Sequence, residues 1–154
     1  MKKYFSLVLF AHTLFAMPFA FIGFFLAIST TSHPFTWLKL VLMVLCMVFA
    51  RSAAMAFNRY LDRFIDAQNP RPVVRDIPSG RVSARGALLF TISNSLLFVL
   101  SAFLINPLCF LLSPVALVVV LGYSYTKRFT PLCHLILGLG LSFAPLGAYL
   151  AITG

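Results

Sequence analysis

The sequence contains no glutamate and only three aspartates, so acidic side chains are almost absent from its 154 residues. Charged residues make up 10% of the chain and hydrophobic residues 61%, and the mean hydropathy is +0.99. A water-soluble domain cannot bury so large an apolar fraction. The scarcity of charge therefore predicts that a lipid bilayer, rather than water, surrounds most of the chain.

The sequence also lacks the residue combinations of common metal centres and covalent catalysts. Its cysteines, Cys46, Cys109 and Cys133, lie in or at the ends of apolar segments without metal-ligand spacing. We interpret them as small buried side chains. Because no Ser-His-Asp or Cys-His arrangement is recognisable, the sequence gives no indication of a protein nucleophile.

Five apolar segments approach or exceed the roughly 20 residues that a helix needs to cross a bilayer. They are residues 4–29, 36–57, 86–105, 108–123 and 131–153. The first is too long for the apolar region of a cleaved signal peptide. The sequence thus predicts an all-α fold, a polytopic transmembrane bundle of about five helices. We expect residues 1–154 to form one membrane domain with a charged cytoplasmic loop at about 58–85.

The basic residues are distributed as in a multi-pass membrane protein, although the net charge is +9. If the N-terminus is cytoplasmic, the inner segments 1–3, 58–85 and 124–130 hold all of the twelve lysines and arginines except Lys39 and Arg51. The outer connections hold none. This positive-inside distribution predicts a cytoplasmic N-terminus and accounts for the net charge without a nucleic-acid partner.

The acidic residues gather after the second apolar segment. Asn58, Asp62 and Asp66 recur at every fourth position, so they fall within an arc of roughly 80° on one helix face. We expect this helix to continue to about Gln68, because Pro70 disfavours helical backbone in the residue before it. Two carboxylates one turn apart repel each other unless a cation lies between them.

Two explanations for this face remain open. Arg59 and Arg63 can pair with the acids as a charged collar at the membrane interface. Alternatively, the oxygen atoms hold Mg²⁺, which commonly binds one or two carboxylates together with substrate phosphates. Basic residues that suit such a phosphate site are Arg71, Arg75, Arg81, Lys127 and Arg128. Taken alone, each of these positive charges is equally explained by its effect on the orientation of the helices in the membrane or by a contact with lipid headgroups.

Two further positions are unusual within apolar helices. Arg51 lies seven residues before Asn58 and shares its helix face to within roughly 20°. An arginine at this depth usually faces a polar cavity, where it can meet an anionic group, although it can also snorkel to the interface. Gly140 and Ala144 form a small-x-x-x-small pair, which is typical of close helix packing.

Several stretches carry a family resemblance in collinear order over nearly the whole chain. Residues 51–83, "RSAAMAFNRYLDRFIDAQNPRPVVRDIPSGRVS", contain N-x-x-x-D-x-x-x-D followed by a loop similar to N-P-R-T and R-P-x-P-S-G. Supporting stretches are "HTLFAMPFAFIG" in the first helix, "YSYTKRFT" with a Y-x-x-x-K pattern, and "APLGAYLAITG" in the fifth helix. Together they resemble the UbiA-type membrane prenyltransferases, in particular the 4-hydroxybenzoate polyprenyltransferase branch.

The resemblance implies a nine-helix fold around a central cavity, in the inner membrane of a bacterium. It implies transfer of a polyprenyl group from polyprenyl diphosphate to an aromatic hydroxy acid such as 4-hydroxybenzoate in quinone biosynthesis. Dihydroxynaphthoate, in menaquinone synthesis, is the alternative acceptor. By this resemblance Asp62 and Asp66 would be the catalytic acids and, with Asn58, the ligands of Mg²⁺, and Arg51 would bind the acceptor carboxylate. The residues that would support the diphosphate and its metal are Asn58, Arg71, Arg75, Tyr123, Lys127 and Arg128.

The sequence departs from the family pattern in two ways. Pro72 and Asp76 stand where the family loop usually has Thr and Pro. The family also has a second acidic motif between its sixth and seventh helices, whereas no acidic residue follows Asp76 here. The chain therefore resembles an N-terminal half, which would need a C-terminal half as its partner. The alternative is a truncated non-catalytic remnant, or a scaffold that binds prenyl diphosphate without turnover.

Overall fold

The computed structural model of the protein describes residues 10–68, 82–130 and 132–154, and its regular elements there are five α-helices. They are α2 (Phe10–Thr30), α3 (Trp37–Gln68), α4 (Ala84–Ile105), α5 (Pro107–Thr126) and α6 (Cys133–Thr153). The predicted all-α fold is confirmed, and so is the continuation of the second predicted helix to Gln68. The 32 residues of α3 extend over about 48 Å, which exceeds the hydrocarbon thickness of about 30 Å.

Four helices of the described part are long and apolar enough to cross a membrane. These candidate spans are Trp37–Ile65, Ala84–Ile105, Pro107–Thr126 and Cys133–Thr153, with hydropathies of 2.0 to 2.2. α2 spans 21 residues, Phe10–Thr30, and its Ala16–Thr30 part is apolar as well. Length and composition therefore agree with the multi-pass membrane protein that the sequence predicts.

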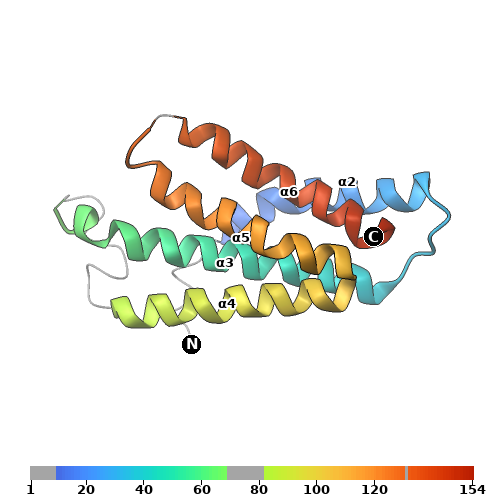
Figure 1. Cartoon of the computed structure of the whole chain (residues 1–154), viewed down its shortest axis with the longest axis horizontal. Coiled ribbons are helices and arrows are strands. Elements are labelled where there is room, and N and C mark those ends of the chain that lie inside the picture. Colours follow the sequence, from blue (N-terminus) through green and yellow to red (C-terminus); the bar gives the residue numbers. More distant parts are fainter. Residues whose placement is uncertain (1–9, 69–81, 131) are drawn as a thin grey trace.

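The helices run side by side as an elongated bundle (Figure 1). α3 packs against α4, α5 lies against both of them, and α6 packs on α5 and α2. Small side chains permit close approach between the α3 and α4 backbones, because Ala53, Ala56 and Ala87 are fully buried. Close packing of this kind is the main source of helix association in lipid, where apolar burial alone gives little advantage.

α2 and α6 meet through a glycine. Ala20, Gly23 and Ala27 are buried on one face of α2, and Phe24 joins Met43, Ala148 and Ile152 in a hydrophobic cluster. A Cβ atom added to Gly23 would lie 2.2 Å from the carbonyl oxygen of Pro145 in α6. Only glycine therefore fits at this crossing.

Asn106 connects three helices at one end of the bundle. It caps the N-terminus of α5, where its Oδ1 accepts from the Cys109 N–H at 2.7 Å, and its Nδ2 donates to the Leu150 carbonyl of α6 at 2.8 Å. Lys39 reaches the same end of α6 and donates to the Ile152 carbonyl at 3.4 Å. A cation near the C-terminus of a helix is favoured by the helix dipole.

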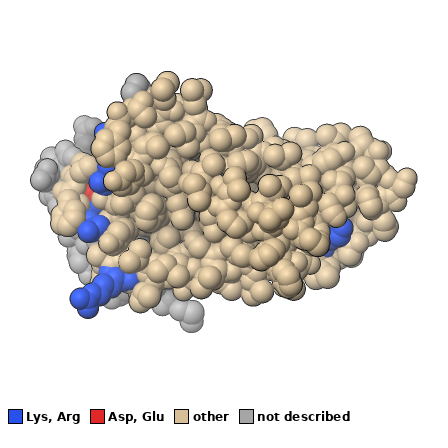
Figure 2. All heavy atoms as spheres, in the orientation of Figure 1, with Lys and Arg blue, Asp and Glu red and all other residues tan. Residues whose placement is uncertain are grey.

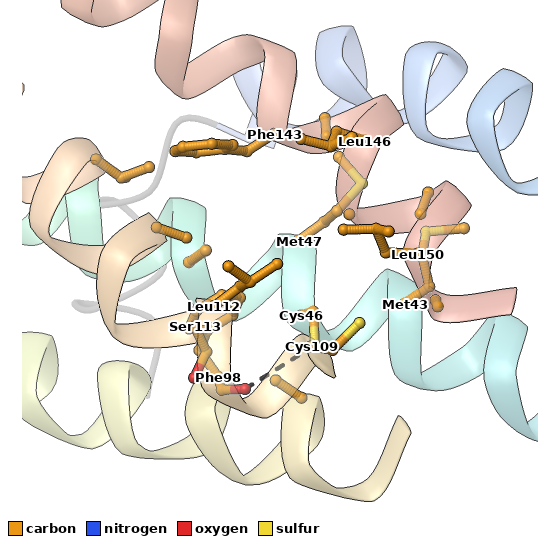
Figure 3. Close-up of a pocket in the computed structure, with 18 of the residues that line it drawn as sticks. Met43, Cys46, Met47, Phe98, Cys109, Leu112, Ser113, Phe143, Leu146 and Leu150 are labelled. Atoms are coloured by element: carbon orange, nitrogen blue, oxygen red, sulfur yellow. Dashed lines mark hydrogen bonds between the residues drawn. The ribbon is translucent and has the colours of Figure 1, made fainter. Parts of the chain in front are cut away.

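Charge is concentrated at the opposite end of the bundle (Figure 2). The basic residues beyond Arg51 on α3, at the start of α4 and at the end of α5 lie there, with Asp62 among them. Between the two ends, the bundle encloses a pocket of about 250 Å³, lined mainly by α3, α5 and α6 (Figure 3). The bundle thus combines a charged end with an apolar cavity in its membrane-spanning part.

Candidate functional site

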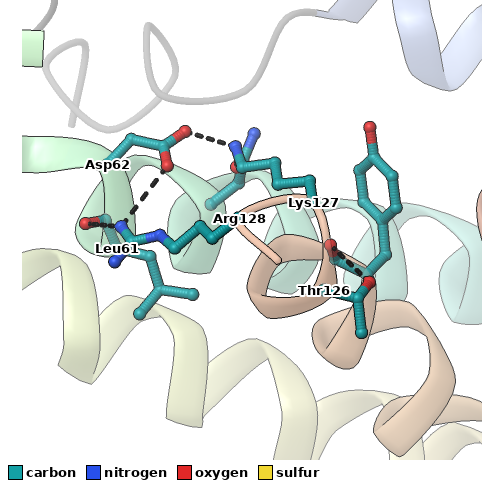
Figure 4. Close-up of polar contacts among 7 residues, drawn as sticks. Leu61, Asp62, Thr126, Lys127 and Arg128 are labelled. Carbon is teal, nitrogen blue, oxygen red and sulfur yellow. Dashed lines mark hydrogen bonds and ion pairs between the residues drawn. The ribbon is translucent and has the colours of Figure 1, made fainter. Parts of the chain in front are cut away.

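Two oxygen atoms of α3 converge on one cation at the charged end (Figure 4). The ammonium Nζ of Lys127 donates to Asn58 Oδ1 and to Asp62 Oδ2. The guanidinium of Arg128 donates to the Leu61 carbonyl and lies 3.5 Å from Asp62 Oδ1. We call Asn58, Asp62, Lys127 and Arg128 the polar cluster. The fold thereby brings together four residues that the sequence analysis selected from two distant stretches.

The end of α5 positions the two cations. Lys127 is the C-cap of this helix in the αR conformation, and its N–H bonds to the Tyr123 carbonyl. The next backbone N–H, of Arg128, bonds to the Tyr125 carbonyl at 3.2 Å. Because the last turn continues into this tight connection, consecutive side chains both reach α3. Tyr123 contributes its carbonyl to this turn, and a role for its phenol remains a prediction.

Asp62 is buried, with 8% of its surface exposed, whereas the Lys127 and Arg128 side chains are 24% and 29% exposed. A buried carboxylate loses hydration and needs compensating partners. Lys127 and Arg128 supply them from across the bundle. Arg63, by contrast, donates to the Tyr60 carbonyl at 2.7 Å and lies 4.2 Å and 4.3 Å from the Tyr60 and Phe64 ring centroids.

The oxygen atoms of the polar cluster suit a hard divalent cation in their chemistry. Asn58 Oδ1 and Asp62 Oδ2 already share one positive charge, that of Lys127, and Mg²⁺ prefers amide and carboxylate oxygens of this kind. Within the described residues no group of three His, Cys, Asp or Glu side chains could hold a metal ion. Asn58 and Asp62 would therefore form an incomplete set that substrate phosphates and water complete.

Other predicted site residues fall outside this description. Asp66 belongs to α3, one turn beyond Asp62, but its side chain is not among those that the structure describes. Arg71 and Arg75 lie in the segment between residues 68 and 82, which is likewise outside the described residues. Their roles therefore remain predictions.

Arg51 lines the pocket, as do residues of all five helices. Among the described residues of that lining it alone is charged, and it lies at about 10 Å, measured along α3, from Asn58. The sequence analysis expected Arg51 to face a polar cavity, but the described residues that line this cavity are apolar apart from Arg51, Ser113 and two cysteines. Gly140 and Ala144 also line it, so the predicted packing pair contributes to a cavity wall.

The sequence analysis missed most of the pocket. Residues from α5 and α6 such as Leu112, Val120 and Gly147 form its wall, yet in the sequence they are ordinary members of apolar segments. Lipid-facing and cavity-facing positions are both apolar in a membrane helix, so periodicity does not separate them. The one available signal was the small size of Gly140, Ala144 and Gly147.

Comparison with known proteins identifies the family to which these features correspond. The model of the UbiA prenyltransferase family matches residues 16–154. The 4-hydroxybenzoate octaprenyltransferase of Photobacterium profundum is 39% identical over 116 residues, and that of Paraburkholderia phytofirmans is 37% identical over 127 residues. These matches cover 75% and 82% of this chain but only 40% and 44% of the relatives.

Two solved structures share the fold. The apo structure of a UbiA homologue from Aeropyrum pernix K1 has a TM-score of 0.85 and 38% identity, covering 94% of this chain and 51% of that one. A UbiA homologue from Archaeoglobus fulgidus, bound to GPP and Mg²⁺, has a TM-score of 0.78 and 21% identity over 99% of this chain and 54% of that one. The chain thus spans about half the length of these solved structures.

Proposed function

The chain belongs to the UbiA prenyltransferase family, and from this premise we propose that its polar cluster binds a prenyl diphosphate together with Mg²⁺. The reaction would transfer the prenyl group to an aromatic hydroxy acid of the 4-hydroxybenzoate type. The observation that carries the proposal is the convergence of Asn58 Oδ1 and Asp62 Oδ2 on the Lys127 ammonium. This arrangement offers both oxygen donors for a metal and cations for phosphate oxygens.

Each residue of the cluster has a distinct chemical part in this proposal. Asn58 and Asp62, with Asp66 one turn further on, would hold Mg²⁺ through oxygen atoms. Bound Mg²⁺ would neutralise the charge that develops on the diphosphate leaving group. Lys127 and Arg128 would turn from Asp62 toward the phosphate oxygens, because a fork of guanidinium donors and a mobile ammonium both bind such oxygens. Arg71 and Arg75 are proposed to assist in the same way.

Arg51 is proposed to bind the carboxylate of the acceptor. Of the described residues that line this largely apolar pocket, Arg51 alone is charged, and an aromatic acid combines one carboxylate with a flat apolar body. The named relatives, which are 4-hydroxybenzoate octaprenyltransferases, favour 4-hydroxybenzoate over the dihydroxynaphthoate alternative. The proposed location is the inner membrane of a bacterium, with the N-terminus and the polar cluster on the cytoplasmic side.

Prenyl transfer in membranes tests this function. Membranes would be prepared from cells that produce the 154-residue chain, and separately from cells that produce it together with any coding sequence downstream of codon 154. Each preparation receives Mg²⁺, a polyprenyl diphosphate and radiolabelled 4-hydroxybenzoate. We expect a prenylated product in at least the second preparation, and a loss of at least 100-fold in Asp62→Asn.

An exposed residue provides the matched control. Arg85→Gln removes a positive charge from the first turn of α4, at the same end of the bundle, and should leave the rate within twofold. Lys127→Gln should raise the KM for the prenyl diphosphate. An Asp62→Asn enzyme of undiminished activity would overturn the assignment.

A non-catalytic scaffold is the second candidate, since the charge of Asp62 is already balanced by Lys127. It would bind prenyl diphosphate without transferring the prenyl group. Binding of radiolabelled geranyl diphosphate to the purified chain, with no product in either membrane preparation, would favour this candidate. Product formation that increases with the amount of chain would exclude it.

A further inference from the structure

Four aromatic rings gather where α2 ends and α3 begins. Phe35, in the connection between the two helices, contacts the other three: its ring centroid lies 6.2 Å from that of Phe24 and 6.5 Å from that of Phe25. The Trp37 ring meets Phe35 edge-on, with 5.0 Å between the centroids. Phe24 is fully buried in the hydrophobic core, whereas the other three rings are 39% to 72% exposed. We call these four residues the aromatic cluster, which joins an exposed surface to the core.

The exposed surface changes from polar to aliphatic across the aromatic cluster. On the side of the connection, Ser32 and His33 are exposed. On the side of the helices, the exposed side chains are aliphatic, among them Ile22 and Leu26 on α2 and Val41 and Leu45 on α3. Aromatic rings, tryptophan above all, concentrate where lipid headgroups meet hydrocarbon. The order of polar, aromatic and aliphatic side chains therefore fits that boundary.

The aromatic cluster lies about one hydrocarbon thickness from the polar cluster. Asn58 follows Trp37 by 21 residues along α3, which is about 31 Å of helix. Asn106 and Lys127, the residues that cap α5, are also 21 residues apart. Lys127 bonds to Asn58, and the connection between α4 and α5 lies at the same end as the start of α3 (Figure 1). Two helices thus give the same length, close to the roughly 30 Å of a bilayer interior.

This match selects the part of α3 that lies in hydrocarbon, since the whole helix is longer than the bilayer interior is thick. Lys39, two residues beyond Trp37, donates to the Ile152 carbonyl at the end of α6. A shift of α3 by one turn in one direction would carry the Lys39 ammonium about 5 Å into hydrocarbon. A shift in the other direction would carry the charges of the polar cluster into hydrocarbon. Both shifts are costly.

We propose that the aromatic cluster binds the phospholipid interface on the side of the membrane opposite the polar cluster, and that it fixes the depth of α2 and α3 there. The indole N–H of Trp37 donates to ester or phosphate oxygens of the lipid, while Phe25 packs on the first methylenes of the acyl chains. Phe35 holds the indole by its edge contact. This inference goes beyond the proposed function and does not depend on prenyl transfer.

The fluorescence of Trp37 tests the proposal without a label, because the sequence contains no other tryptophan. The purified chain is reconstituted into vesicles of phosphatidylcholine and phosphatidylglycerol. The lipids are brominated either near the headgroup end of the acyl chain or near its terminal methyl, since bromine quenches an indole that it contacts. We expect the shallow bromines to quench Trp37 at least twofold more than the deep ones.

A displaced tryptophan provides the matched control. Leu45 is exposed on the same helix, eight residues after Trp37, and therefore lies about 12 Å deeper, near the middle of the bilayer. In the double variant Trp37→Phe and Leu45→Trp, the deep bromines should quench more than the shallow ones. This reversal would show that the two lipids report depth in this protein.

Phe35→Leu tests whether the rings fix the depth. The change removes the ring that contacts the other three but keeps an apolar side chain, and it should at least halve the ratio of shallow to deep quenching of Trp37. Phe129→Leu is the control for the loss of an exposed ring. Phe129 is 73% exposed and lies 5.3 Å from Tyr125, between ring centroids, near the polar cluster. It should leave the quenching of Trp37 unchanged.

The quenching pattern also names the results that would overturn the proposal. Equal or stronger quenching of Trp37 by the deep bromines would contradict its depth. Iodide on both sides of the vesicle membrane that quenches more than either lipid would place the rings in water. Absence of quenching by lipid and iodide alike would mean that a protein surface covers the rings. A Phe35→Leu protein of native helix content with unchanged quenching would show that the rings do not fix the depth.

These outcomes are independent of the proposed function. No quenching measurement involves a diphosphate, Mg²⁺ or turnover. If Trp37 lies at the interface but no membrane preparation transfers prenyl groups, this inference stands and the enzymatic function fails. If prenyl transfer occurs and Trp37 lies elsewhere, the function stands and this inference fails.

Discussion

The ammonium of Lys127 lies between Asn58 Oδ1 and Asp62 Oδ2. Lys127 follows Asn58 by 69 positions and Asp62 by 65 positions in the sequence, so this one cation contacts two residues that are distant from it along the chain. The contact ties the end of α5 to the part of α3 where the acidic residues gather. It also means that the two oxygen donors proposed for Mg²⁺ are held together by a positive charge before any ligand arrives. Replacing the charge of Lys127 therefore tests both its contribution to stability and the proposed binding of Mg²⁺ by the two oxygen atoms.

Lys127→Met should make the protein less stable but more responsive to Mg²⁺. The variant leaves buried Asp62 with one cationic partner fewer, which we expect to cost about 1–2 kcal/mol, less than a fully buried pair because Lys127 is partly exposed. Mg²⁺ can then occupy the vacated position between the oxygens without displacing an ammonium. Thermal unfolding in detergent, with and without millimolar Mg²⁺, should show a larger rise in Tm for the variant than for the wild type.

The carboxylate itself provides the control for this experiment. Asp62→Asn should abolish the Mg²⁺-dependent rise in Tm both in the wild type and in Lys127→Met. Arg85→Gln, at an exposed position of α4, should leave that rise unchanged. A Lys127→Met protein that responds to Mg²⁺ no more than the wild type would show that these oxygens do not form a metal site.

A double-mutant cycle between Asp62 and Lys127 should reveal strong coupling. Each single change, Asp62→Asn or Lys127→Met, leaves a partly buried partner without its counter-charge, whereas the double variant removes both charges. We therefore expect the double variant to be less destabilised than the sum of the single variants, by about 1 kcal/mol or more. Reversible unfolding in mixed micelles measures the free energy of unfolding of the two single variants and the double variant relative to the wild type. Additive effects would contradict a direct ion pair.

The sequence predicts the helices well because the bilayer imposes a minimum length on each apolar segment. It also predicts the end of α3 near Gln68, because Pro70 disfavours further helix. It does not predict which cation meets Asp62. Arg59 and Arg63 are nearer in sequence than Lys127, and only the packing of α5 against α3 brings Lys127 to the carboxylate.

Lys39 illustrates the same limit. The sequence analysis leaves it as an exception to the positive-inside distribution, whereas the structure shows it donating to the Ile152 carbonyl at the end of α6. The pairing depends on the contact between α3 and α6, which local sequence does not encode. The resemblance to a family selected Asn58, Asp62 and Lys127 together, and the pocket wall from α5 and α6 became visible only in three dimensions.

Gly23→Ala should destabilise the bundle more than its small size suggests. The new Cβ would lie 2.2 Å from the Pro145 carbonyl oxygen, a backbone atom that cannot rotate away. Overpacking of this kind typically costs about 1–3 kcal/mol. Gly122→Ala in α5 is the matched control, since its Cβ would meet nothing within 4 Å and alanine favours helix by about 0.8–1.0 kcal/mol. Thermal unfolding should give Gly23→Ala a lower Tm than the wild type and Gly122→Ala a higher one.

Asn106 offers a way to separate capping from helix-to-helix connection. Asn106→Ala removes the acceptor for the Cys109 N–H and the donor to the Leu150 carbonyl, and we expect a loss of about 2 kcal/mol, of which the cap accounts for about 1 kcal/mol. Asn106→Asp retains an acceptor for the cap but no donor for Leu150, so its carboxylate faces a carbonyl oxygen. Amide hydrogen exchange should therefore show increased opening at the end of α6 in both variants, but increased opening in the first turn of α5 only in Asn106→Ala. Equal protection of α6 in the wild type and in Asn106→Asp would mean that the bond to Leu150 contributes nothing to closing this end of the bundle.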